Sequence, residues 1–170
     1  MNLIDDPSMK EIVVDFCNES DSLVEELEEI LSSLEEDIEN HANFEKFGQI
    51  IDRIMGAAKS IGAKDIATLS ELGKTIGYKS SQVNDTPLLE IVVAVLFDSL
   101  DIMKKLLSNL REGNKQNLQQ INTKAFVTRL NWLSEKFKDI ERSSVAYKNN
   151  NNNDQLSQNS IDDLLKTLGL

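Results

Sequence analysis

Residues 44–62 read Phe-Glu-Lys-Phe-Gly-Gln-Ile-Ile-Asp-Arg-Ile-Met-Gly-Ala-Ala-Lys-Ser-Ile-Gly, and this stretch decides the fold. An α-helix turns about 100° per residue, so the stretch would divide into an apolar and an outward side. The apolar side holds Phe44, Phe47, Ile51, Ile54 and Ala58, and the outward side holds Glu45, Gln49, Asp52, Gly56 and Ser60. We expect Gly62 to end the helix, because glycine readily adopts the left-handed conformation. The outward side is either an ordinary solvated face or a site.

The whole chain has the pattern of an all-α protein. Its 170 residues suit one domain of ordinary size with an accessory segment. Apolar residues recur at spacings of three and four, and only two prolines and seven glycines interrupt them. We therefore expect an antiparallel helical bundle with a four-helix core.

The remaining helices follow from the same periodicity and from turn signals. A polar connection at 40–43 would make His41 a loop residue, and Ser20 or Asp21 would cap a helix that follows a shorter one. Thr86-Pro87 is a typical helix start, because proline is tolerated in the first turn. The expected helices span residues 9–18, 21–38, 44–62, 64–78, 86–111 and 125–140.

Composition excludes several kinds of function. The net charge of −11 disfavours nucleic acid and anionic membrane surfaces, which need basic stripes. Cys17 is the only cysteine and His41 the only histidine, so no intramolecular disulfide, cysteine metal cluster, histidine-centred metal site or catalytic triad is expected. The N-terminal residues do not resemble a signal peptide, and the longest apolar run, 88–96, is too short to span a bilayer. We expect a cytoplasmic protein without membrane insertion.

The composition changes abruptly after residue 142. Residues 143–159 are polar and include five consecutive asparagines, a composition typical of a flexible linker. Residues 160–170 restore a short helical pattern, with Ser160 and Asp163 placed as a capping box. Its apolar residues are Ile161, Leu164, Leu165 and Leu168. So short a helix is marginal alone, so we expect it to fold in a groove of a partner; docking on its own bundle is the alternative. The predicted organisation is a bundle domain at 1–142, a linker at 143–159 and a partner-binding peptide at 160–170.

Two stretches resemble CheZ, the chemotaxis phosphatase. Residues 45–55 resemble its catalytic helix, in which an acid precedes the catalytic glutamine by one turn, and residues 160–170 resemble the C-terminal peptide that captures CheY. The resemblance implies that Gln49 orients the attacking water and that Glu45 pairs with a receiver lysine; Asp52 is the alternative docking acid. It implies receiver contacts from Gly56 and from the peptide residues Ile161, Asp162, Asp163, Leu164, Leu165 and Leu168. No cofactor of its own is expected, since the receiver supplies Mg²⁺.

Residues 16–113 also resemble the histidine phosphotransfer (HPt) domain of CheA. Anchored on Gly56, the phosphoryl-accepting histidine falls at Asp52 and the accompanying lysine at Met55. With no imidazole expected on this helix, the chain would keep only the fold and its docking face for a receiver. The first resemblance implies a homodimer and the second a monomer, which leaves the oligomeric state open.

The leading hypothesis is a CheZ-type phosphatase that binds phosphorylated CheY and accelerates hydrolysis of its aspartyl phosphate. The alternative is a non-enzymatic pseudo-HPt adaptor that binds a response-regulator receiver domain. A plain structural bundle explains the core but not residues 160–170.

Overall fold

The computed structural model describes residues 3–114 and 118–144, apart from the side chains of 119 and 141–144. All the regular structure in these residues is helical, so the all-α prediction is confirmed. The elements are η1 (Leu3–Asp5), η2 (Pro7–Met9), α1 (Lys10–Glu36), α2 (His41–Ile61), α3 (Lys64–Ser80), α4 (Thr86–Arg111), η3 (Leu118–Gln120) and α5 (Lys124–Ser144). The predicted linker beyond residue 144 and the predicted peptide at 160–170 lie outside the described residues.

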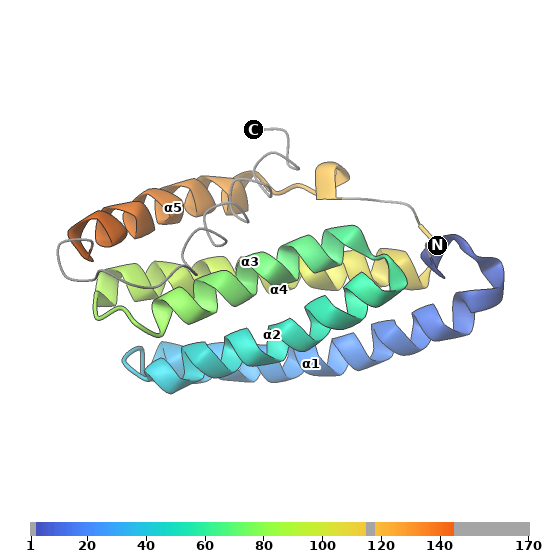
Figure 1. Ribbon diagram of the computed structural model, residues 1–170, viewed down its shortest axis with the longest axis horizontal. Helices are drawn as coiled ribbons and strands as arrows, with labels where there is room; N and C mark the ends of the chain where they lie inside the picture. The colour runs from blue at the N-terminus through green and yellow to red at the C-terminus, as the bar shows by residue number, and fades with distance from the viewer. Residues whose placement is uncertain (1–2, 115–117, 145–170) are drawn as a thin grey trace.

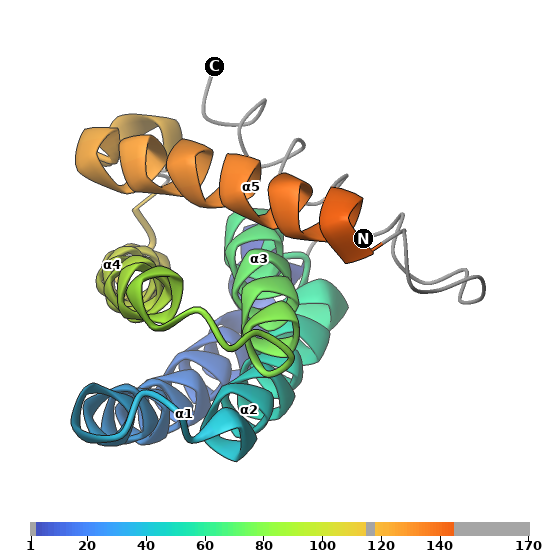
Figure 2. The ribbon, with the colours of Figure 1, turned by 90° about the vertical axis from the view of Figure 1, so that its left-hand side faces the viewer.

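Four long helices, α1 to α4, lie side by side, and α5 covers α3 and α4 (Figures 1 and 2). The chain reverses direction at the connection between each of these four helices and the next (Figure 1). The helix α2 has α1 and α3 as neighbours, while α5 lies on the opposite side of the bundle (Figure 2). This arrangement leaves the outward face of α2 uncovered by α5.

The central helix α2 begins and ends at specific capping residues. The Asn40 side chain accepts a hydrogen bond from the Asn43 backbone N–H at 3.3 Å, and Gly62 adopts a left-handed conformation with φ of 83°. The predicted end at Gly62 is confirmed, but the predicted loop at 40–43 is wrong, because the Asn40 cap starts the helix at His41. The helix therefore carries an imidazole, about three turns before Asp52. His41 is therefore not at the position of Asp52, where the resemblance to an HPt domain would require the histidine.

The predicted break between residues 18 and 21 is also wrong, since α1 is continuous from Lys10 to Glu36. The reason is that its buried stripe continues through the supposed break, with Cys17 and Ser20 both in the interior. Asp21, predicted as a possible cap, instead forms an ion pair with Arg111 at the end of α4. Tertiary contacts thus override the local capping signal.

The other helix ends lie close to the predicted ones. The helix α4 starts at Thr86 as expected, with the Asp85 side chain accepting from the Leu88 N–H at 3.1 Å as the actual cap. Gly113 follows α4 with φ of 73°. The helix α5 runs to Ser144, two residues into the segment predicted as linker. Its Trp132 is partly exposed at 38%, with the Lys136 ammonium 5.4 Å from the ring centre.

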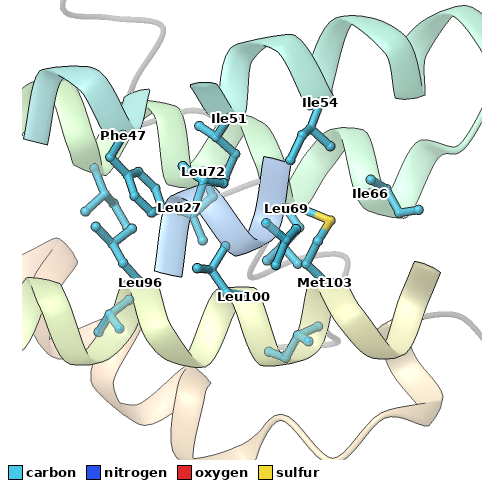
Figure 3. Close-up of a cluster of buried hydrophobic side chains, with 14 of the residues drawn as sticks. Leu27, Phe47, Ile51, Ile54, Ile66, Leu69, Leu72, Leu96, Leu100 and Met103 are labelled. Carbon is cyan, nitrogen blue, oxygen red and sulfur yellow. The ribbon is translucent and has the colours of Figure 1, made fainter. Parts of the chain in front are cut away.

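The core is formed where the apolar faces of the helices meet (Figure 3). The predicted apolar side of α2 is entirely buried there, as the fully enclosed Phe44, Phe47, Ile51, Ile54 and Ala58 show. Their burial turns the opposite side of α2 outward.

Glycines let α2 and α3 approach each other closely. A Cβ added to Gly77 of α3 would lie 3.0 Å from the Phe44 carbonyl oxygen, and one added to Gly48 would lie 3.2 Å from the Tyr78 ring. Both contacts are tighter than ordinary van der Waals packing, so the missing side chains are what allow the spacing. This contact fixes the position of α3 side chains beside the outward face of α2.

Candidate functional site

The structure places the predicted residues of α2 on one side of the helix. Glu45, Gln49 and Gly56 are exposed, and Asp52 is half-buried at the edge facing α3. Side chains three or four residues apart on a helix are neighbours, with Cβ atoms about 5–6 Å apart. We call Glu45, Gln49, Asp52 and Gly56 the α2 face.

Glu45 and Gln49 are the free polar groups of this face. Neither side chain forms a hydrogen bond or ion pair with any residue that the structure describes. Gln49 lies near the middle of α2 and Glu45 one turn inside its N-terminal cap, so both side chains project from regular helix. The pair can therefore offer a carboxylate and an amide to a partner without first breaking internal contacts.

Asp52 differs because it already has a partner. Its Oδ1 lies 2.8 Å from the Lys74 ammonium of α3, which donates a hydrogen bond to it. Both side chains are about one-third to two-fifths exposed, so the pair lies at the surface rather than in the core. The Asp52 carboxylate is thus neutralised by a residue from another helix.

The α3 side of the face holds two residues that the sequence interpretation missed, Lys74 and Tyr78. They lie one turn apart on α3, opposite Asp52 and Gly48 of α2. In a helical hairpin, residues about equally far from the turn face each other. Pairing 44–62 with 64–78 in this way would have pointed to both residues.

Basic residues flank Gln49 on its other side. Lys46 and Arg53 each lie one turn from Gln49 and are exposed, and Arg53 lies 4.0 Å from Glu19 of α1. An ion pair at that distance between side chains this exposed constrains Arg53 little. Gln49 thus lies between an acidic edge and a basic edge.

Gly56 lies at the open end of the face, where a Cβ would meet no atom within 4 Å. Its missing side chain is therefore not required by the packing of this chain, in contrast to Gly48 and Gly77. A glycine in an exposed helix interior costs about 1 kcal/mol relative to alanine. This cost has no compensation among the described residues.

Two further properties of the described residues concern ligands and membranes. No three of their histidine, cysteine or acidic side chains come together in a group that could hold a metal ion. None of their helices is both long and apolar enough to cross a bilayer.

In comparisons with known proteins, no family model, curated protein or solved structure matches the chain. The resemblances to CheZ and to the HPt domain therefore stay predictions that rest on the quoted residues. The predicted partner residues of the peptide, from Ile161 to Leu168, lie outside the described residues.

Proposed function

We propose that this chain is a CheZ-type phosphatase that accelerates hydrolysis of the aspartyl phosphate of a CheY-like receiver domain. The observation that carries the proposal is Gln49, an exposed amide without an internal partner in the middle of a rigid helix, with the free acid Glu45 one turn earlier. The open helix surface suits a macromolecular partner. The sequence resemblance supplies the identity of that partner.

The reaction needs positioning more than acid–base catalysis. Water attacks phosphorus in line, its oxygen forms the new P–O bond, and the bond to the receiver carboxylate breaks. The products are a free carboxylate and inorganic phosphate, which carries the proton lost by the water. The Gln49 carbonyl oxygen accepts a hydrogen bond from the water and directs its oxygen toward phosphorus. The receiver contributes its own Mg²⁺ and lysine.

Glu45 is the docking acid that the geometry favours over Asp52. Asp52 is already held by Lys74 at 2.8 Å, so pairing with the receiver lysine would require it to share or exchange that partner. Glu45 is exposed and has no described partner. Gly56 leaves room for the receiver backbone to approach the end of the α2 face.

The decisive experiment is phosphate release from a receiver phosphorylated with acetyl phosphate. We expect Gln49→Ala to lose at least about 10²-fold in the accelerated rate, because a positioning contribution of this kind is large, while receiver affinity changes little. Gln82→Ala is the matched control, since Gln82 is an exposed amide on the connection between α3 and α4. Equal rates for Gln49→Ala and the parent chain would rule out the phosphatase mechanism.

The pseudo-HPt adaptor predicts a different result in the same assay. Asp52 stands where an HPt domain needs histidine, and it is already paired with Lys74. An adaptor would bind the receiver without changing the rate of phosphate release in any variant. Binding by calorimetry together with an unchanged release rate would therefore select the adaptor.

A further inference from the structure

The pair formed by Asp52 and Lys74 stands beside Gln49, and its charge bears on what the α2 face can accept. Asp52 follows Gln49 by three residues, so their side chains are neighbours, with Cβ atoms about 5–6 Å apart. Lys74 reaches the same place from α3, with its ammonium 2.8 Å from Asp52 Oδ1. The close glycine packing of α2 against α3 fixes this meeting point.

A receiver carrying an aspartyl phosphate presents to this face an anionic group that its own Mg²⁺ and lysine offset only in part. The chain has a net charge of −11, so its overall field opposes the approach of such a partner. A bare Asp52 carboxylate next to Gln49 would add local repulsion at the point where the phosphoryl group must arrive. Lys74 cancels that charge while remaining about one-third exposed.

We propose that Lys74 is a specificity-determining residue of the α2 face, which makes the surface around Gln49 receptive to a phosphorylated receiver by neutralising Asp52. This inference rests on the proposed function. Lys74 acts through Asp52 and is a positioning residue rather than a catalytic one. In this proposal, the net charge of the Asp52–Lys74 pair determines how well the α2 face accepts the phosphorylated receiver.

Four proteins test the inference: the parent chain, Lys74→Met, Asp52→Asn and the double variant. The rate constant kcat/KM for phosphate release is measured with the phosphorylated receiver at low and high salt. We expect Lys74→Met to lower kcat/KM about tenfold at low salt, mainly through KM, because the exposed Asp52 charge slows association. At about 0.5 M salt the loss should shrink to about twofold, since the charge is screened.

The double variant distinguishes neutralisation from a direct phosphate contact. If Lys74 acts by cancelling Asp52, removing both charges should restore kcat/KM to within about twofold of the parent. Asp52→Asn alone should raise kcat/KM at low salt, because it leaves the Lys74 cation without its counter-charge beside Gln49. A double variant as slow as Lys74→Met, or a strong loss in Asp52→Asn, would overturn the inference.

A matched control separates this local effect from the change in net charge. Lys104→Met removes the same charge from an ion pair of similar exposure, Lys104 with Glu28, between α4 and α1. We expect its kcat/KM to stay within about twofold of the parent. Melting temperatures of all variants verify folding. Equal kinetics for Lys74→Met and Lys104→Met would contradict a special role of Lys74.

A binding readout keeps this test separate from the phosphatase proposal. The receiver activated with beryllofluoride, which stands in for the phosphoryl group, is titrated against each variant. We expect Lys74→Met to lose the preference for the activated over the unmodified receiver about tenfold, and the double variant to regain it. If the parent chain binds but does not accelerate hydrolysis, the proposed function fails while this titration still decides the role of Lys74.

Discussion

Asp52 and Glu45 are the same kind of group on the same side of α2, yet they have different surroundings. Lys74 holds the Asp52 carboxylate at 2.8 Å, whereas Glu45 has no partner in the described part of the chain. A surface pair of this kind contributes only about 0–1 kcal/mol to stability. The pair therefore contributes little to holding the fold together, and the role that we propose for it is its charge next to Gln49.

Cys17 shows the opposite case of a reactive group made inert by burial. The side chain is fully enclosed in α1, and its thiol donates a long hydrogen bond of 3.7 Å to the Leu107 carbonyl oxygen. Burial raises the pKa of the Cys17 thiol, because the thiolate would lose its hydration. The residue fills space in the core as a small apolar group.

We predict that Cys17 in the folded protein resists alkylation by iodoacetamide at pH 8 and reacts at least about 10²-fold faster in guanidinium chloride. The raised pKa keeps the thiol protonated, and burial keeps the reagent away. The pKa of Cys17 is higher in the folded than in the unfolded protein, so the folded state holds the thiol proton more tightly. The free energy of unfolding is therefore unaffected by this group below about pH 8.5 and decreases as the pH rises further. Mass spectrometry of the adduct follows the reaction, and equal rates in both states would contradict the burial.

The helices α2 and α3 form the element that supports the site. Gly48 and Gly77 lie where the two helices approach each other, and each would bring a Cβ to within 3.2 Å or less of the opposite helix. Alanine has the higher helix propensity, so these glycines are costly locally and are favoured only by the tertiary contact. Gly56 has no such contact.

The two kinds of glycine lead to opposite predictions. Gly77→Ala should destabilise the fold by about 1–2 kcal/mol, because the new Cβ meets the Phe44 carbonyl oxygen at 3.0 Å and pushes the helices apart. Gly56→Ala should stabilise it by about 0.5–1 kcal/mol, since its Cβ enters open space in a helix interior. Chemical denaturation of both variants measures the difference.

The affinity of Gly56→Ala for the receiver tests the proposed role of Gly56 in binding. If the receiver backbone packs against this glycine, Gly56→Ala should weaken the complex severalfold although the protein itself becomes more stable. A variant that is more stable and binds with parental affinity would remove Gly56 from the proposed interface.

At the scale of the whole molecule, the helix α2 lies on one side of the bundle and α5 on the other (Figure 2). The sequence adds a polar segment and the amphipathic stretch at 160–170 beyond α5. If the predicted linker is flexible and the stretch at 160–170 captures a receiver as we propose, the receiver would be kept near the α2 face at an effective concentration of roughly millimolar. Capture and hydrolysis would then be separate tasks of one chain.

We predict that replacing Ile161, Leu164, Leu165 and Leu168 with serine lowers receiver affinity about 10²-fold, because it removes the apolar side chains that we propose bind the receiver. Chain length is unchanged, and Lys166→Ser serves as the control on the polar side. Titration calorimetry measures the affinity. Unchanged affinity with a lower melting temperature would instead show that the stretch docks on its own bundle.

The fold was more predictable than the site. The apolar side of α2, its end at Gly62 and the start of α4 at Thr86 all follow from local periodicity and capping chemistry. The predicted break near Ser20 is wrong, because the free energy gained by burying this part of α1 against neighbouring helices is larger than that of a local helix cap. The sequence predicts a loop at His41 because residues 40–43 are mostly polar, although the first of them, Asn40, is the N-cap of α2.

The sequence by itself determined the helical class and which side of each helix is buried, because a repeat of about 3.6 residues is a local property. It also placed Glu45, Gln49, Asp52 and Gly56 on one side of α2. Only the tertiary structure decided that Asp52 is paired and Glu45 free, because that depends on how α3 packs against α2. The close glycine contacts set the register of α3 against α2 and so bring Lys74 to Asp52. The hydrophobic periodicity of residues 44–62 contains no information about this contact.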